Sequence, residues 1–168
     1  LPITQFYGFD GSDKAPDLIV GGAQDNGAYT YTSGAWTNVI TGDGYECAID
    51  EVNQTFAYTE GNGAFGPTTI FRSNNSGISW FSISNTKPPN ESGPLTRPIL
   101  SHPINGQLYA GYHDLWKLPN PRQSSIISSD WIKLSNFSAP PFNVPSNVAL
   151  KSVEISPTDP NIIYVLYS

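Results

Sequence analysis

Alternating apolar and polar residues divide the chain into short strands separated by polar turns. The stretch from Phe6 to Gly22 contains two such strands around one turn, and the same pattern starts again at positions 46, 98 and 152. The turns inside these pairs are rich in Asp, Asn, Pro and Gly, the residues that hairpin turns require. No window shows sustained apolar spacing at the helical period. The pattern therefore predicts a repeat built from antiparallel strand pairs.

Each of the first three repeats continues into two further strands, the second of which starts at a tryptophan. The predicted strands are Ala28–Ser33 with Trp36–Ile40, Thr69–Ser73 with Trp80–Ser84, and Leu115–Leu118 with Trp131–Ser135. The repeats start 40, 52 and 54 residues apart, close to the roughly 40 to 50 residues of a four-stranded propeller blade. We therefore expect an all-β chain: one partial β-propeller of four-stranded antiparallel blades.

The predicted blades cover residues 1–40, 45–84 and 97–135, and a half blade covers 149–168. Because ring closure removes exposed sheet edges, we expect about three and a half blades of a larger ring. The remaining blades of the same propeller, or a partner chain, would complete it. The chain contains no Met, so we also expect a processed or excised piece.

The turn Ser73–Trp80 contains polar residues with separate structural tasks. Asn75 is expected to accept hydrogen bonds from turn amides, Gly77 to supply a positive φ, and Trp80 to pack the hairpin against its blade. The first and third repeats vary this turn, as Ser33–Trp36 and Pro119–Asp130. The three equivalent tryptophans, Trp36, Trp80 and Trp131, are interpreted as packing residues rather than ligand platforms.

These positions, Ser73, Asn75, Gly77, Ser79 and Trp80, resemble the Asp-box (BNR repeat), with an amide in place of the usual acid. The chain thus resembles the Asp-box propeller superfamily, which includes sialidases, xyloglucan-degrading enzymes and the sortilin ectodomain. The motifs Thr4–Tyr7, Gly21–Gly27 and Gly42–Gly44 are similar to those of secreted or surface propellers of Bacteroidota. The resemblance implies an extracellular or cell-surface location and a structural role for the box.

Composition narrows the classes of function. The net charge of −6 and the pI near 4.6 argue against a duplex nucleic-acid binder, which needs clustered Lys and Arg. No apolar run is long enough to cross a bilayer, so no membrane insertion is expected. The three arginines, Arg72, Arg97 and Arg122, depart from the pattern by which sialidases grip the substrate carboxylate. Cys47 is interpreted as a buried strand thiol.

Propeller topology places the loops between second and third strands, and those between blades, on one rim, where ligands usually bind. The candidate ligand-binding residues on this rim are Gln24, Asp25, Asn26, Asp43, Tyr45, His113, Asp114 and Trp116. Their amides and carboxylates would meet sugar hydroxyls or a cation, beside Tyr45, Phe65 and Trp116 as exposed apolar surfaces. Turn chemistry alone also accounts for Asp25-Asn26-Gly27.

Catalysis would require two carboxyls, about 5 Å apart for a retaining glycosidase or about 6.5 to 9.5 Å for an inverting one. The candidates are Asp25, Asp43 and Glu60, together with Glu46, which as a strand residue alternatively points into the channel. His113 beside Asp114 has the composition of a general base with its orienting group, or of an ordinary turn. No cofactor motif is present; Asp10, Ser12, Asp13 and Asp17 offer oxygens to Ca²⁺, or form a solvated turn.

The sequence therefore favours an extracellular propeller that acts without catalysis, as a scaffold or as a binding module for glycan or protein. The alternative is a glycoside hydrolase that cleaves a polysaccharide through rim carboxylates. A third possibility is a spacer whose surface binds nothing specific.

Overall fold

The computed structural model of the chain describes residues 4–62, 68–83 and 96–167. These residues form four antiparallel sheets, three with four strands and one with two. The chain divides into two compact units, residues 1–84 and 85–168. In the described part of the chain, no helix is long and apolar enough to span a membrane.

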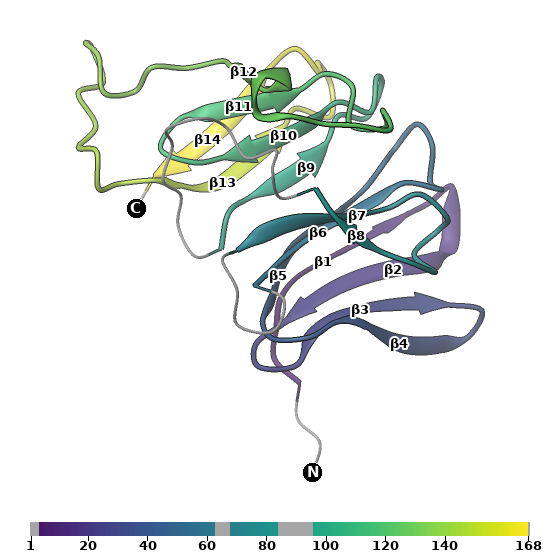
Figure 1. Cartoon of the computed structure of the whole chain (residues 1–168). Helices are drawn as coiled ribbons and strands as arrows, with labels where there is room; N and C mark the ends of the chain where they lie inside the picture. The colour runs from purple at the N-terminus through teal and green to yellow at the C-terminus, as the bar shows by residue number, and fades with distance from the viewer. Residues whose placement is uncertain (1–3, 63–67, 84–95, 168) are drawn as a thin grey trace. The chain divides into compact units, whose positions relative to one another are not determined.

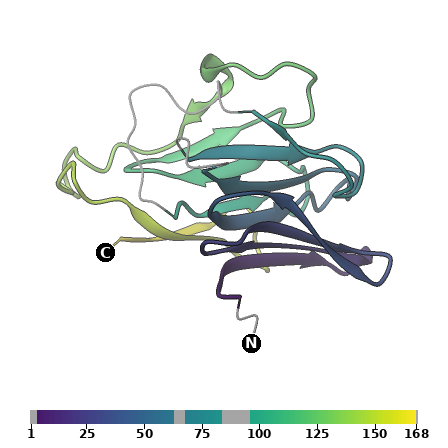
Figure 2. The ribbon, with the colours of Figure 1, turned by 60° about the horizontal axis from the view of Figure 1, so that its bottom comes forward.

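The first unit contains two sheets whose strands follow one another in chain order (Figures 1 and 2). The first sheet consists of β1 (Phe6–Ser12), β2 (Ala15–Ala23), β3 (Gly27–Thr32) and β4 (Ala35–Ile40). The second consists of β5 (Gly44–Ile49), β6 (Ala57–Gly61), β7 (Thr69–Ser73) and β8 (Phe81–Ser82). Except for the short β8, these strands fall where the alternation of apolar and polar residues predicts them.

Tight turns set the register of the first sheet. Ser12 lies opposite Ala15, so only Asp13 and Lys14 connect β1 to β2. Ser33 and Gly34 connect β3 to β4 with φ angles of 52° and 83°. Two consecutive positive φ values are characteristic of a type I′ turn, whose twist matches that of the strands it joins.

One face of the first sheet packs against the second sheet. Leu18 and Val20 of β2 meet Cys47 and Ile49 of β5 and Ala57 of β6. Val20, Ile49 and Ala57 are fully buried, so these residues form the core of the first unit. Trp80 packs on the edge of this core.

The equivalent tryptophan Trp36 lies on the other face of the first sheet and is 49% exposed. Its ring centroid is 6.0 Å from that of Phe6 and 5.4 Å from that of Tyr31. Trp131, in the third repeat, is 4% exposed. The three tryptophans therefore have three different environments, because each sheet face is covered to a different extent.

The second unit contains one four-stranded and one two-stranded sheet. The strands are β9 (Ile99–Ser101), β10 (Leu108–Gly111), β11 (Leu115–Leu118), β12 (Ile132–Lys133), β13 (Leu150–Ile155) and β14 (Ile163–Tyr167). Tyr109 and Leu115 of the four-stranded sheet pack with Leu150 and Val153 of β13. A single 3₁₀ turn, Ser128–Asp130, lies in the long segment between β11 and β12.

The prediction of an all-β chain with four-stranded antiparallel sheets is confirmed. The outermost strands of the second and third sheets are shorter than predicted, at two residues each. In the third sheet the Trp131 N–H donates to Ser128 O of the 3₁₀ turn (3.3 Å), so β12 starts after the tryptophan. Phe65, which was expected to be an exposed apolar surface, lies outside the described residues.

Candidate functional site

The loop between β2 and β3 exposes three polar side chains: Gln24, Asp25 and Asn26. Asp25 has a φ of 59° and Gly27 one of 81°, so the chain reverses within three residues. Asn26 Nδ2 donates to Gln24 O (2.9 Å), and Asn38 Nδ2 donates to Asn26 O (2.7 Å). The Asp25 side chain thus stands on a turn that is held by its neighbours.

Asp43 precedes β5 and joins three segments of the first unit. Its Oδ1 accepts the Asp25 N–H (2.7 Å), and its Oδ2 accepts Asn62 Nδ2 (3.0 Å) and the Tyr45 hydroxyl (3.3 Å). The backbone N–H of Asp43 donates to Asn62 Oδ1 (2.7 Å). The carboxylate is therefore engaged by protein donors. Asn62, which the sequence did not single out, belongs to this group as an amide in the next loop of the same rim.

Tyr45 was expected to be exposed, and this is wrong: it is 1% exposed. The side chain lies in β5, where its ring centroid is 5.5 Å from that of Tyr7 on β1, so the first sheet helps to cover it. Burial, followed by the neighbouring Asp43 carboxylate, raises the pKa of Tyr45 to about 12. Tyr45 is therefore a packed, neutral hydrogen-bond donor rather than an aromatic platform.

The other carboxyl candidates also lie close to the protein interior. Glu60 of β6 is fully buried. Glu46 of β5 is half-buried, and a Cβ added at Gly8 would lie 2.6 Å from Glu46 Oε2. The Glu46 carboxyl thus lies against the backbone of β1. Among the four candidate carboxyls, only that of Asp25 is exposed, whereas those of Asp43 and Glu46 are half-buried.

In the second unit Asp114 has structural partners. Its side chain is 1% exposed, and Lys133 Nζ of β12 lies 2.6 Å from Oδ2. Its Oδ1 accepts the Phe137 N–H (2.7 Å) and the Ser135 hydroxyl (3.0 Å). Burial alone would raise the pKa of Asp114, but these donors outweigh it and hold the pKa below its usual value. Asp114 therefore connects the turn after β10, by hydrogen bonds and an ion pair, to β12 and to the residues that follow it.

His113 and Trp116 do not form an accessible pair with Asp114. His113 is 9% exposed, and its Nδ1 lies 2.7 Å from Val148 O. Trp116 is 6% exposed, which contradicts the expectation of an exposed platform, and Lys133 Nζ lies 5.6 Å from the centre of its ring. The side chain is buried because it belongs to β11, an inner strand of its sheet.

The turn between β7 and β8 is closed by its own side chains. Asn75 Oδ1 accepts the Ser79 N–H (2.9 Å), and Ser73 Oγ accepts the Gly77 N–H (2.9 Å). Gly77 has a φ of 79°, and Trp80 Nε1 donates to Gly77 O (3.0 Å). The amide at position 75 thus supplies the acceptor oxygen that the turn requires.

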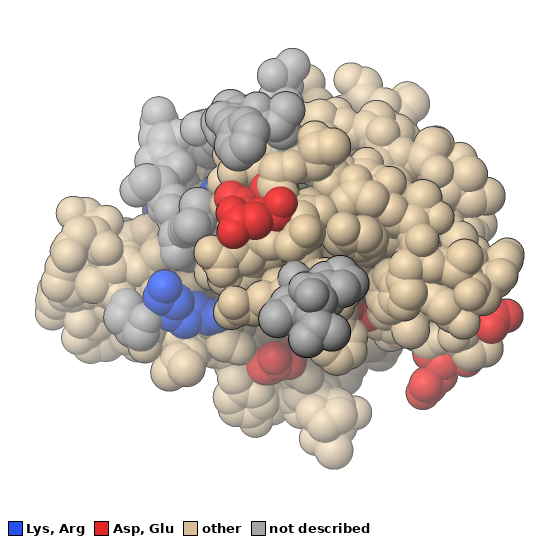
Figure 3. Space-filling model, turned by 90° about the horizontal axis from the view of Figure 1, so that it is seen from below, with Lys and Arg blue, Asp and Glu red and all other residues tan. Residues whose placement is uncertain are grey.

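The turn considered for Ca²⁺ uses its first carboxylate internally. Asp10 accepts the N–H groups of Gly11 (2.9 Å) and Ile49 (2.7 Å) through its two oxygens. Burial raises the pKa of Asp10 although both bonds oppose the rise. No group of three or more His, Cys, Asp or Glu placed to hold a metal ion is found among the described residues. On the face shown in Figure 3, acidic side chains lie in separate places on a largely uncharged surface.

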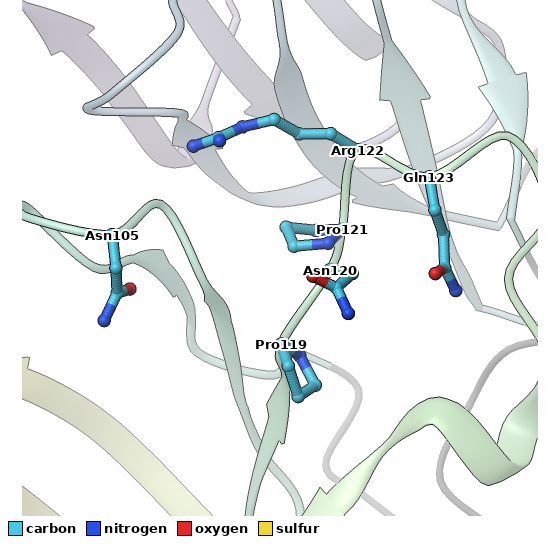
Figure 4. Close-up of a pocket in the computed structure, with 6 residues that line it drawn as sticks. All are labelled: Asn105, Pro119, Asn120, Pro121, Arg122 and Gln123. Carbon is cyan, nitrogen blue, oxygen red and sulfur yellow. The ribbon is translucent and has the colours of Figure 1, made fainter.

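The second unit contains a hollow that the sequence did not indicate (Figure 4). Its volume is about 410 Å³, and its lining residues are Asn105, Pro119, Asn120, Pro121, Arg122 and Gln123. They come from the turn between β9 and β10 and from the segment that follows β11. The available signal was the length of Pro119–Asp130, which replaces a short turn in the other repeats.

Comparisons with known proteins identify the fold. No protein-family model and no curated protein matches the sequence. The solved structures that match include the GH74 xyloglucanase from Xanthomonas campestris, with 17% identity and a TM-score of 0.62, and the GH74 enzyme from Niastella koreensis, with 16% identity and a TM-score of 0.64. Each match covers 98% of this chain and 28% or 27% of the other chain. The chain has a β-propeller fold and spans little more than a quarter of the length of these structures.

Proposed function

We propose that this chain is a non-enzymatic part of an extracellular β-propeller and serves as a scaffold or as a binding module for glycan or protein. The observation that carries the proposal is the state of the rim carboxylates. The Asp43 carboxylate already accepts hydrogen bonds from the Asp25 N–H, Asn62 and Tyr45, whereas the side chains of Gln24, Asp25 and Asn26 are exposed. Such a rim offers hydrogen bonds from a fixed turn, as a binding surface requires.

The rim group suits hydroxyl-rich ligands. Two amides and one carboxylate provide both donors and acceptors. The bond from the Asp25 N–H to Asp43 fixes the backbone of the turn, so little backbone entropy is lost when a ligand binds. The ligand class proposed for this rim is therefore a glycan or a polar protein loop.

The proposed partners are further blades, from the same propeller or from a partner chain. In β14, Ile163, Val165 and Tyr167 pack on the core of the second unit, whereas Tyr164 and Leu166 are 60% and 61% exposed. The sheet formed by β13 and β14 has two strands, and the other sheets have four. Apolar side chains along an incomplete sheet favour a neighbouring sheet as their cover.

Membership of the Asp-box superfamily, including its sortilin-like and Bacteroidota surface branches, is also proposed. The hydrogen bonds of Ser73, Asn75 and Ser79 support it, because the polar residues of the turn act as the motif requires. An extracellular location follows from this proposed kinship. Ca²⁺ binding at the turn of Asp10 stays a prediction.

The second candidate function is that of a glycoside hydrolase acting on a polysaccharide. It is favoured by the fold shared with two GH74 structures, one of which is described as a xyloglucanase. Asp25 would then be one of the two carboxyls that glycosidic cleavage needs. Glu60 and Asp43 are less suited, because one is fully buried and the other is engaged by three donors.

A panel of immobilised glycans and polysaccharides distinguishes the two functions. Two quantities are measured for each glycan: the amount of protein that it retains, and the new reducing ends that the protein releases from it. The informative variant is Asp25→Ala, and Asp13→Ala is its matched control, because Asp13 is also an exposed turn carboxylate. Retention without release, weakened by Asp25→Ala alone, is the expected result. Release that disappears in Asp25→Ala would establish the hydrolase instead. Retention that is equal in both variants would exclude the rim of the first sheet as the binding surface.

A further inference from the structure

The hollow in the second unit has two walls that are each fixed by the protein. One wall is the turn between β9 and β10. His102 Nδ1 accepts the N–H groups of Ile104 (3.2 Å) and Asn105 (3.4 Å), so the proton lies on Nε2 and is donated to Pro160 O (3.1 Å). This imidazole, 7% exposed, holds Asn105 in place. Asn105 Oδ1 in turn accepts the Gln107 N–H (3.0 Å).

The other wall is a proline-fixed turn. The Gln123 N–H donates to Asn120 O (3.2 Å), which places Pro121 and Arg122 at the two central positions of a β-turn. Proline is favoured at the first of these because its ring fixes φ. Gln123 Nε2 donates to Asp130 Oδ2 (2.7 Å), and the Ile127 N–H donates to the same oxygen (2.8 Å). The segment is therefore ordered before any ligand arrives.

The chemistry of the lining is specific. It contains one guanidinium, three amides and two proline rings, and no carboxylate. In Figure 4 the Arg122 side chain extends from its wall towards the side on which Asn105 lies. A guanidinium has five N–H donors, so Arg122 can keep its contacts within the protein and still present donors to a bound anion.

The distribution of charge favours an anion here rather than in the first unit. Residues 96–167 contain five Lys and Arg against four Asp and Glu, whereas residues 4–83 contain two against nine. The overall acidity of the chain therefore resides in the first unit. An anionic ligand approaching the hollow is not repelled by an excess of negative charge in the second.

We propose that this hollow binds an acidic sugar, a uronic acid unit. Its carboxylate would pair with Arg122, its hydroxyls with the amides of Asn105 and Asn120, and its C–H faces with the rings of Pro119 and Pro121. A volume of about 410 Å³ lies within the range of small-molecule sites, roughly 300 to 1,000 Å³. The segment after β11 replaces the short structural turns of the other repeats, and loop replacements on a rigid scaffold are where binding sites arise. The proposal is independent of the rim of the first sheet.

The test is an NMR titration of the ¹⁵N-labelled protein with glucuronic acid, with glucose and acetate as probes that lack the carboxylate or the sugar ring. Glucuronic acid is expected to bind with a Kd of about 10 mM or lower and to shift the amide signals of Arg122 and Gln123. Glucose and acetate should each bind at least about tenfold more weakly, since each lacks one half of the recognition.

Arg122→Gln should weaken glucuronate binding about tenfold or more, because a charge-assisted hydrogen bond is lost. Lys151→Gln is the matched control: it removes the same charge from an exposed position on β13 and should leave the affinity unchanged. The ¹⁵N spectrum itself verifies that each variant is folded. Asp25→Ala should also bind glucuronate normally, which separates this site from the proposed function.

Three outcomes would overturn the proposal. Glucose that binds as tightly as glucuronate would remove the role of the carboxylate. Equal effects of Arg122→Gln and Lys151→Gln would indicate non-specific charge attraction. Absence of shifts at the Arg122 and Gln123 amides up to about 10 mM glucuronic acid would show that the hollow does not accept this class of ligand.

Discussion

Replacing Asp114 with Asn should lower the free energy of unfolding by about 2 to 3 kcal/mol. Breaking a buried ion pair costs about 3 to 5 kcal/mol when one charge is left without its partner. Here the Asp114 side chain is 1% exposed but that of Lys133 is 40% exposed, so water screens part of the attraction and the loss is smaller. The amide keeps an oxygen for the Phe137 N–H (2.7 Å). Its amino group, however, would face the Lys133 ammonium.

The same substitution should change how stability depends on pH. Burial works to raise the pKa of Asp114, but the donors Lys133, Phe137 and Ser135 bring it below the usual value. The folded-state pKa is thus below the unfolded-state pKa of about 3.9, so this contribution is complete above that pH and is lost as the pH falls towards the folded-state value. The wild type and Asp114→Asn should therefore differ in stability near neutral pH and converge in acid.

Urea denaturation followed by tryptophan fluorescence, at about pH 7 and about pH 3, measures both effects. Glu154→Gln is the matched control, because Glu154 is an exposed carboxylate on β13 of the same unit. It should change stability by less than about 0.5 kcal/mol. Two results would refute a structural role for Asp114: an Asp114→Asn variant as stable as the control at neutral pH, or a difference from wild type that does not shrink in acid.

Three further predictions concern the first unit. Gly77→Ala should destabilise the protein more than Gly34→Ala in the same denaturation assay. Both glycines have a positive φ, but a Cβ added at Gly77 would lie 2.4 Å from Thr30 Cγ2, whereas one added at Gly34 would meet nothing within 4 Å. A comparable loss of stability in both variants would contradict this difference in packing. Asn75→Ala should lower the free energy of unfolding by about 1 to 3 kcal/mol because it leaves turn donors unsatisfied, whereas Asn75→Asp keeps the acceptor oxygen and should lower it less. The midpoints of thermal unfolding rank the two variants. A lower midpoint for Asn75→Asp than for Asn75→Ala would contradict the hydrogen bonding of this turn. Burial raises the pKa of the Cys47 thiol to about 12, so iodoacetamide at about pH 8 should alkylate Cys47 only in the unfolded protein. Mass spectrometry measures the alkylation, and a folded protein that carries the added mass would contradict this prediction.

Local features of this molecule were predictable from sequence. The strand pairs starting at residues 6, 46, 98 and 152 follow from alternation and turn composition, which act over a few residues. The turn between β7 and β8 was also predictable, because its hydrogen bonds are local. Ser73 bonds to Gly77 and Asn75 to Ser79, each four residues further along the chain. The sequence alone therefore determined the class of fold, the sheets and most strand limits.

The tertiary structure decided which candidate residues are accessible. Asp43 contacts Asn62 and Asp25, which are 19 and 18 residues away in the chain. Asp114 contacts Lys133, which is likewise distant in the chain. Sequence composition therefore could not distinguish these carboxylates from exposed ones. Tyr45 and Trp116 are buried because neighbouring strands and sheets cover them. The hollow beside Arg122 depends on two segments brought together by the register of β10 and β11. Register and face coverage are properties of the whole sheet, which explains why local sequence predicted the strands but not the site.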